Sequence, residues 1–300
     1  MIKLNGLHLL LSYQCTFECE HCFAWGSPWQ TGTMTLATIR RILAQASEAG
    51  TVEWIYFEGG EPFLYYQTML AGINLAFEQD FKVGVVTNSY WATSLEDALL
   101  WLTPLAGKIQ DLTISSDLFH FSEKVSKQSK YVTEAAKQLD IPLGIICIEQ
   151  PDIDALSSLG QIPSDSSSIM FRGRAAEKLA PKVPHYPAEQ FTSCPHENLS
   201  DPGRVHVDPF GNLHICQGIS LGNILAEDLD TICDLFDPET NPIISHLLDG
   251  GPYKLSKTNG DFVPGEYADA CHLCFETRKF LRNQYSDILT PNQMYGVVTD

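Results

Sequence analysis

Residues 9–22 read LLLSYQCTFECEHC, an apolar run that leads directly into three closely spaced cysteines. A near-continuous apolar run is typical of a parallel strand that is covered on both faces. Cys15, Cys19 and Cys22 have the spacing C-x3-C-x2-C. Three thiolates are one short of a closed zinc site, whereas an iron–sulfur cluster held by three cysteines keeps one iron open to another ligand. The stretch therefore predicts a core strand that ends in an iron–sulfur loop.

Similar apolar runs recur along the chain to about residue 175. The runs lie at Leu9–Tyr13, Trp54–Phe57, Val83–Thr87, Leu112–Ser115, Leu143–Ile148 and Ser168–Phe171. Stretches with helical spacing separate most of them, at Thr35–Ala49, Phe63–Gln79, Ser94–Leu105 and Phe121–Leu139. A repeat of about 30 residues is the size of a βαβ unit, and six such units fall short of the roughly 250 residues of a closed eight-stranded barrel. We expect an α/β fold, an open and partial (β/α)6 TIM-like barrel.

The regular alternation of apolar runs and helical stretches ends near residue 175. Residues 178–187 carry three prolines, which is typical of a boundary or crossing loop. Beyond it we expect a hairpin of Arg204–Asp208 and Asn212–Cys216, a short helix after Asn223 and another after Cys274. The expected organisation is a core domain at 1–180 and a small, loop-rich α+β domain at 181–300.

Composition excludes several classes of protein. The chain has 300 residues, of which 44% are hydrophobic, so it is not a disordered chain. Its formal net charge of −18 disfavours a nucleic-acid partner, which needs a surplus of Lys and Arg. No apolar run approaches the roughly 18 residues of a membrane span. With no export signal, we expect a cytoplasmic protein whose nine cysteines serve metal or redox chemistry rather than disulfides.

A second motif follows the second predicted strand. Residues 58–62 read EGGEP. Gly59 and Gly60 let the backbone approach a ligand closely, and Pro62 fixes the exit from the turn. Exposed backbone carbonyls together with Glu61 suit an ammonium group.

These two motifs, each placed after a strand of an α/β repeat, resemble those of the radical S-adenosylmethionine (radical SAM) superfamily. The resemblance implies that Cys15, Cys19 and Cys22 hold a [4Fe–4S] cluster whose open iron chelates the amino and carboxylate groups of SAM. It implies that Gly59, Gly60, Glu61 and Pro62 hold the methionine end. Reduction of the cluster then cleaves SAM to a 5′-deoxyadenosyl radical, which abstracts hydrogen from a substrate. One departure is His21, where the family usually has a carbocyclic aromatic residue.

Polar residues at the ends of the later strands are the further candidates, because functional residues of α/β barrels collect at the carboxyl ends of strands. The candidate SAM contacts are Asn88, Ser115, Asp117, Glu149, Arg172 and Arg174. Hydroxyl, amide and carboxylate groups suit the ribose and adenine, and an arginine suits the SAM carboxylate. Asp117 and His120 are the candidate catalytic residues. Ordinary turn, surface or helix-capping roles are the alternative for these positions.

The last third of the sequence supplies four more cysteines, which are Cys194, Cys216, Cys271 and Cys274. With residues 211–216 in the pattern G-x4-C, they resemble the twitch form of the SPASM domain, which implies one auxiliary [4Fe–4S] cluster. A structural zinc on the same thiolates is the alternative. Cys147 and Cys233 stand in apolar contexts and are expected to be buried core residues.

The expected activity is modification of a peptide or protein side chain. The first alternative is dehydrogenation or rearrangement of a small molecule, and the second is a non-catalytic iron–sulfur scaffold or electron-transfer protein. An electron donor such as flavodoxin or ferredoxin is an expected partner, and we expect no membrane partner. Because the first strand begins near residue 8, we expect no N-terminal peptide-recognition domain, so a peptide would need a separate carrier protein or direct binding to the barrel.

Overall fold

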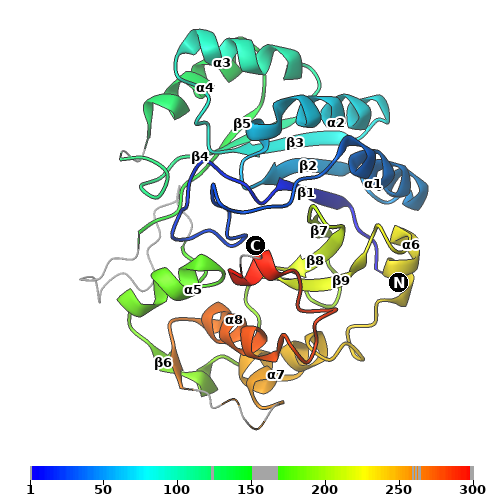
Figure 1. The fold of residues 1–300 in the computed structure, drawn as a ribbon, viewed down its shortest axis with the longest axis vertical. Helices are drawn as coiled ribbons and strands as arrows, with labels where there is room; N and C mark the ends of the chain where they lie inside the picture. The colour runs from blue at the N-terminus through cyan, green and yellow to red at the C-terminus, as the bar shows by residue number, and fades with distance from the viewer. Residues whose placement is uncertain are drawn as a thin grey trace.

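The fold is organised by one large sheet (Figure 1). The computed structural model describes residues 2–122, 125–150, 168–258, 260, 262 and 265–297. Within these residues, eight strands form the sheet in the order β5-β4-β3-β2-β1-β7-β8-β9. Their bounds are β1 Gly6–Ser12, β2 Trp54–Gly59, β3 Lys82–Thr87, β4 Asp111–Ser115, β5 Leu143–Ile146, β7 Arg204–Val207, β8 Asn212–Cys216 and β9 Ile219–Asn223. The neighbours from β5 to β7 are parallel, and β8 and β9 are antiparallel. The predicted open, partial barrel is confirmed.

Helices cross over between the parallel strands. They are α1 Leu36–Ala49, α2 Tyr66–Glu78, α3 Leu95–Leu102 and α4 Lys127–Gln138. The caps of α1 are those expected: the Thr35 side chain accepts the Thr38 N–H, and Gly50 adopts the left-handed conformation at φ 67°. Helix α4 begins later than the predicted Phe121, because the carboxylate of Asp117 first folds the backbone at Phe119 and His120 into a turn.

The sixth parallel strand does not come from the predicted residues. The run Ser168–Phe171 forms no strand, because its backbone turns to other partners: the Phe171 N–H donates to the Asp269 carboxylate at 3.2 Å. The sixth strand is instead β7, which pairs with β1 along Gly6–Leu9. The predicted hairpin of β7 and β8 is confirmed, and it carries the sheet past the predicted boundary near residue 180.

The C-terminal part packs beneath this sheet in the view of Figure 1. It contains α5 Arg174–Lys178, α6 Leu229–Leu235, α7 Ile244–Ser256, α8 Ala270–Leu281 and the two-stranded β6 Tyr186–Pro187 with β10 Glu266–Tyr267. The predicted helix after Cys274 was placed too late. Helix α8 begins at Ala270, because the Asp269 side chain caps it by accepting the His272 N–H, and its first two turns therefore carry Cys271 and Cys274.

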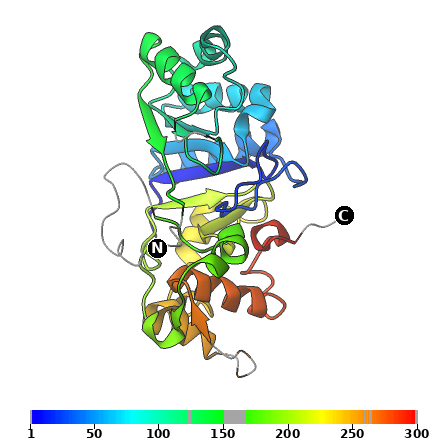
Figure 2. The same cartoon turned by 90° about the vertical axis from the view of Figure 1, so that its left-hand side faces the viewer.

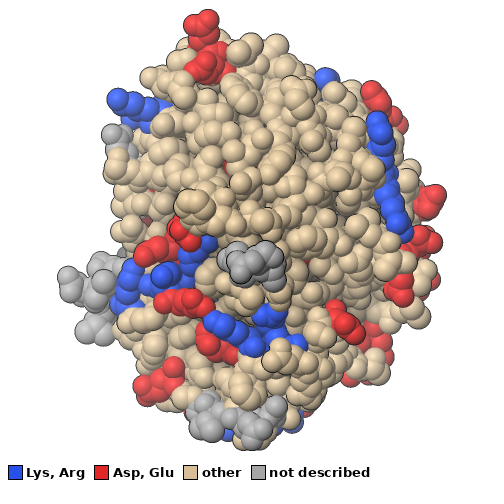
Figure 3. All heavy atoms as spheres, in the orientation of Figure 1, with Lys and Arg blue, Asp and Glu red and all other residues tan. Residues whose placement is uncertain are grey.

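Charged side chains are dispersed on the face of the molecule that Figure 3 shows. Figure 2, turned from the first view, shows the barrel helices at one end of the molecule and the C-terminal helices at the other. Figure 3 shows acidic and basic side chains interspersed on a largely uncharged face, so the net charge of −18 is not concentrated there. Among the described residues, none of the helices has the length and apolar character needed to cross a bilayer.

Candidate active site

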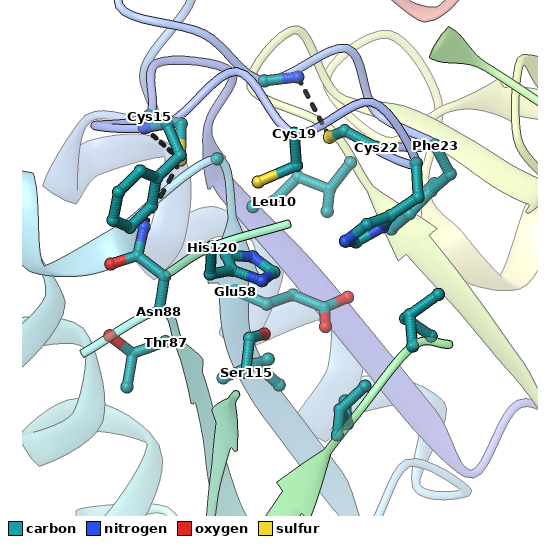
Figure 4. A pocket seen from close by; sticks show the side chains of 18 residues that line it. Leu10, Cys15, Cys19, Cys22, Phe23, Glu58, Thr87, Asn88, Ser115 and His120 are labelled. Atoms are coloured by element: carbon teal, nitrogen blue, oxygen red, sulfur yellow. Dashed lines mark hydrogen bonds between the residues drawn. The ribbon is translucent and has the colours of Figure 1, made fainter. Parts of the chain in front are cut away.

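The three N-terminal cysteines line one pocket with a volume of about 240 Å³ (Figure 4). They lie on the loop that follows β1, and backbone N–H groups of this loop donate hydrogen bonds to two of the three sulfur atoms. The Phe17 N–H donates to Cys15 Sγ at 3.4 Å, and the Gly26 N–H donates to Cys22 Sγ at 3.2 Å. Donors to sulfur stabilise thiolates and the clusters that thiolates bind. The loop is therefore shaped to present three sulfur ligands to the pocket.

The electrostatic state of these thiols fits metal ligation. Burial raises the pKa of Cys15 to about 12, and burial also raises the pKa of Cys19 far above its usual range. Without metal, both thiols are protonated near neutral pH, and a bound metal replaces the protons because coordination favours the thiolate. Of the described cysteines, the pocket takes only Cys15, Cys19 and Cys22. A donor set of three sulfurs fits a [4Fe–4S] cluster with one iron left for another ligand.

Close packing of the backbone requires glycine at both Gly59 and Gly60 of EGGEP. Gly59 has φ 134°, and a Cβ there would lie 2.6 Å from the Ser12 carbonyl oxygen. A Cβ on Gly60 would lie 2.1 Å from the Gln14 carbonyl oxygen. The end of β2 thus packs backbone to backbone against the cysteine loop, and both glycines also line the pocket. The predicted close approach exists, and its partner in the structure is the loop that carries the cysteines.

Glu61 does not face the pocket as the ammonium interpretation required. Its side chain is fully buried, and its carboxylate accepts the N–H groups of Phe63 at 3.0 Å and Asn88 at 2.8 Å and the Thr87 hydroxyl at 2.8 Å. Burial raises the pKa of Glu61 to about 7, although these donors oppose the shift. Pro62 is likewise buried, at the start of a short 3-10 helix. Glu61 acts as a positioning residue that ties β2 to the end of β3.

Glu61→Ala is expected to lower the free energy of unfolding by about 3 kcal/mol, because three buried donors lose their acceptor and each costs about 1–3 kcal/mol before relaxation. The raised folded-state pKa means that the stabilisation by Glu61 is complete below its unfolded value of 4.5 and decreases as the pH rises to about 7. The loss should therefore be larger at pH 5 than at pH 8. Urea unfolding at both values measures it.

Glu48 provides the matched control for this variant, since it is an exposed glutamate on α1. Glu48→Ala should change stability by less than about 0.5 kcal/mol. Equal effects of the two substitutions would contradict the positioning role of Glu61.

Asn88 and Ser115 are brought to the pocket as predicted from their strand ends. Asn88 follows β3, and its side-chain amide donates to Cys15 Sγ at 3.5 Å and to Thr16 Oγ1 at 3.1 Å. Ser115 is the last residue of β4 and lines the same pocket. Through Glu61 and Asn88, the EGGEP segment is thus linked to the sulfur of Cys15.

Asp117 and His120 form a pair beside the cysteines. Asp117 is buried and accepts a hydrogen bond from His120 Nδ1 at 2.7 Å, while Ile148 N–H donates to its other oxygen at 3.2 Å. Burial opposes the charge of Asp117, but the hydrogen bond and charge of His120 outweigh burial and lower its pKa. His120 lines the pocket and Asp117 lies behind it. Asp117 therefore orients His120, whose second ring nitrogen is left for the pocket.

The three remaining candidates lie elsewhere. Arg174 is buried and donates to the carbonyl oxygens of Cys19 at 2.7 Å and Gly26 at 2.8 Å, so it braces the cysteine loop from behind. Arg172 lies at the C-terminal cysteines, where it donates to Cys216 Sγ at 3.3 Å. Glu149 is half-buried and is not among the described residues that line the pocket. The expected contacts of Arg172, Arg174 and Glu149 with SAM are therefore not brought about by this geometry.

The sequence argument missed side chains that enter the pocket from the strands themselves. Leu10 of β1 and Glu58 of β2 pair in register and both line the pocket. The alternation of side chains along a strand was the available signal, because residues two apart share the interior face. Phe17 and Phe23 of the cysteine loop supply further apolar lining.

The four C-terminal cysteines form a second pocket. Cys194, Cys216, Cys271 and Cys274 line it together with two arginines, the half-buried Arg172 and the buried Arg278. Burial raises the pKa of Cys274 to about 11, and Arg278 opposes the shift. Of the two cysteines outside both sets, Cys233 lies in the hydrophobic core as expected, whereas Cys147 is only half-buried and the expectation of a core position was wrong for it.

Comparisons with known proteins agree with this geometry. A family model described as the radical SAM superfamily matches residues 9–138. The chain is 22% identical over 178 residues to the putative peptide biosynthesis protein YydG of Bacillus subtilis (strain 168), covering 59% of this chain and 52% of that protein. It is 32% identical over 82 residues to an S-adenosylmethionine-dependent nucleotide dehydratase of Selenomonas ruminantium, covering 27% of this chain and 29% of that protein.

The chain thus spans about half the length of the first relative and less of the second. Among solved structures, it is similar to BtrN in complex with AdoMet and 2-DOIA, with a TM-score of 0.56 and 18% identity. That likeness covers 85% of this chain and 91% of BtrN, and it shows a shared fold. Residues 9–138 therefore form a radical SAM domain.

Proposed function

We propose that the chain is an enzyme that reductively cleaves SAM and uses the resulting radical to abstract hydrogen from a substrate. The observation that carries the proposal is the convergence of Cys15, Cys19 and Cys22 on a pocket that also takes Gly59 and Gly60. When bound, the [4Fe–4S] cluster with SAM supplies one electron from an external donor and the 5′-deoxyadenosyl radical. A flavodoxin or ferredoxin is the proposed donor.

The residues of the chain position the reactants. The three cysteines hold the cluster, and Asn88 steers Cys15 through its amide. Ser115 lies where it can bind a hydroxyl group of SAM, and His120, oriented by Asp117, lies where it can exchange a proton with SAM or substrate. Apolar side chains such as Phe17 and Leu10 exclude water from the pocket, which protects a radical from side reactions.

The proposed substrate is a peptide or protein side chain. The likeness to a protein called a putative peptide biosynthesis protein supports it. A carrier protein would present the peptide. The alternative is a small molecule that is dehydrogenated or rearranged, and the likeness to a nucleotide dehydratase over 82 residues supports that alternative.

The C-terminal pocket is proposed to hold an auxiliary [4Fe–4S] cluster on Cys194, Cys216, Cys271 and Cys274, within a module of residues 181–300. The two arginines beside these cysteines support iron–sulfur over zinc. Arg172 donates to Cys216 Sγ, and hydrogen bonds and positive charge at cysteine sulfur raise the reduction potential of a cluster. A cluster tuned in this way would accept the electron left on a substrate radical.

The test uses the full chain, reconstituted anaerobically, with SAM, dithionite and deuterium-labelled candidate substrates. Transfer of deuterium into 5′-deoxyadenosine is expected from the true substrate, and it reports the substrate and the abstraction site together. A protein that forms no 5′-deoxyadenosine under these conditions would not be the proposed enzyme. Transfer from a labelled small molecule, with none from peptides, would replace the peptide proposal with its alternative.

A further inference from the structure

A second convergence of ligand atoms lies on the interior face of the barrel. His8 of β1, Glu58 of β2 and His206 of β7 each direct one ligand atom to a common point, and these atoms lie within 4.8 Å of one another. His8 Nδ1 is 3.2 Å from Glu58 Oε1, and His206 Nε2 is 3.0 Å from the same oxygen. The strand register explains the meeting, because His8 pairs with His206 on one side and Leu10 pairs with Glu58 on the other.

This polar cluster occupies space that a barrel usually fills with branched aliphatic side chains. Its three side chains are only 17%, 14% and 15% exposed. Their aromatic neighbours fix them: the Tyr56 ring stacks on His8 at 4.5 Å, and Phe23 packs on His206 at 5.4 Å. A ligand set held on three strands is preorganised, which is what a metal site requires.

The Tyr56 ring that stacks on His8 is tightly packed against Gly84. A Cβ on Gly84 would lie 2.2 Å from the Tyr56 ring, so glycine leaves room for the ring that stacks on His8. The Tyr56 hydroxyl donates to the Asp111 carboxylate at 3.0 Å, which anchors the ring to β4. The stack on His8 is thereby supported by three neighbouring strands.

The chemical types of the three side chains are those of metal ligands. Two imidazoles and one carboxylate meet within 4.8 Å of one another. Neutral imidazoles and a carboxylate are the ligands that zinc and ferrous iron take in open, three-ligand sites.

We propose that His8, Glu58 and His206 bind one divalent transition-metal ion at a site separate from both cysteine sets. Ligand distances of about 2.1 Å place neighbouring ligands of one ion about 3.0–3.4 Å apart, and the two distances to Glu58 Oε1 lie at that spacing. Glu58 also lines the pocket below the three cysteines in Figure 4. The proposed site therefore adjoins, through Glu58, the space where a substrate would lie.

The chemistry of the ligand follows from that position. A divalent cation at the floor of the pocket would hold an oxygen group of the substrate, such as a hydroxyl, carboxylate or phosphate, beneath the radical. This second statement rests on the proposed function, whereas the metal site itself depends on none of the seven cluster cysteines.

The test is a titration of the anaerobically reconstituted full chain with Co²⁺, followed by equilibrium dialysis and by the visible absorption of bound Co²⁺. With the cysteines occupied by clusters, the wild type is expected to bind one Co²⁺ with nitrogen and oxygen ligands. Glu58→Gln and His8→Gln should each weaken this binding on the order of 100-fold, since even outer-shell partners contribute 10–100-fold. Glu48→Gln, at an exposed glutamate of α1, keeps all three ligands and should retain binding within a few-fold.

Iron content and circular dichroism establish that each variant is folded. Binding by both ligand variants with the wild-type Kd, or no binding by the wild type, would overturn the metal site. Formation of 5′-deoxyadenosine separates the two proposals. If it persists without Co²⁺ binding, only the metal site fails, and if it is absent while Co²⁺ binds, only the proposed function fails.

Discussion

Cys19→Ser is expected to reduce 5′-deoxyadenosine formation to background. Cys19 is one of three sulfurs at the pocket, and no further described cysteine lines that pocket to replace it. A serine hydroxyl is a poor ligand for iron in an iron–sulfur cluster, so the cluster is lost or left with two sulfurs. The expected decrease exceeds about 100-fold, because loss of an outer-shell partner alone costs 10–100-fold. Chromatography of the nucleoside after incubation with SAM and dithionite measures the rate.

Cys233→Ser is the matched control for the loss of a cysteine. Cys233 lies on α6 in the hydrophobic core and lines neither cysteine pocket. It should retain iron and SAM cleavage close to wild type, with a moderate loss of stability from the buried hydroxyl. If Cys19→Ser cleaved SAM as fast as this control, the assignment of the cluster to the N-terminal loop would be wrong.

The double variant Cys271→Ala/Cys274→Ala is expected to lose about half of the iron. Two [4Fe–4S] clusters give about eight irons per chain, and removal of two of the four C-terminal ligands should leave about four. Both positions lie in the first two turns of α8, where alanine favours the helix, so the fold should persist. SAM cleavage should continue in this variant, because the N-terminal pocket is intact. Iron analysis and Mössbauer spectra measure the loss.

The complementary control is the triple variant Cys15→Ala/Cys19→Ala/Cys22→Ala. It should also keep about four irons, now at the C-terminal site, and it should form no 5′-deoxyadenosine. Recovery of one zinc and no iron in this triple variant would establish the structural zinc site in place of the auxiliary cluster.

Local signals in the sequence predicted the barrel well. The α1 caps, the β7–β8 hairpin and the position of the cysteine loop after β1 all depend on residues that are close in sequence. The cysteine spacing after the first strand, together with the EGGEP motif, carried the resemblance that implied the chemistry of the first cluster. The backbone geometry of a few neighbouring residues determines such features. The hydrophobic pattern and the local residue preferences of a sequence therefore predict them.

Contacts between distant residues were not predictable in this way. The run Ser168–Phe171 has the composition of a strand, yet its backbone bonds to Asp269, almost 100 residues away. Arg172 was expected at the SAM carboxylate or in an ordinary turn or surface role, and its hydrogen bond to Cys216 Sγ was not foreseen. Glu61 was expected to face a ligand. Its carboxylate instead accepts hydrogen bonds from Phe63, Thr87 and Asn88, which hold it in the interior.

The pairing of β1 with β7 has a consequence for how the chain is made. Leu7 pairs with Val205, so the two edges of this ladder lie about 200 residues apart. At a synthesis rate of roughly 5–20 residues per second, β1 leaves the ribosome about 10–40 s before its partner exists. During that interval one edge of the apolar strand that begins the barrel is unpaired, and an unpaired edge is a template for aggregation. The β1–β7 ladder thus leaves an apolar strand edge of the nascent chain open to wrong pairing until β7 is complete.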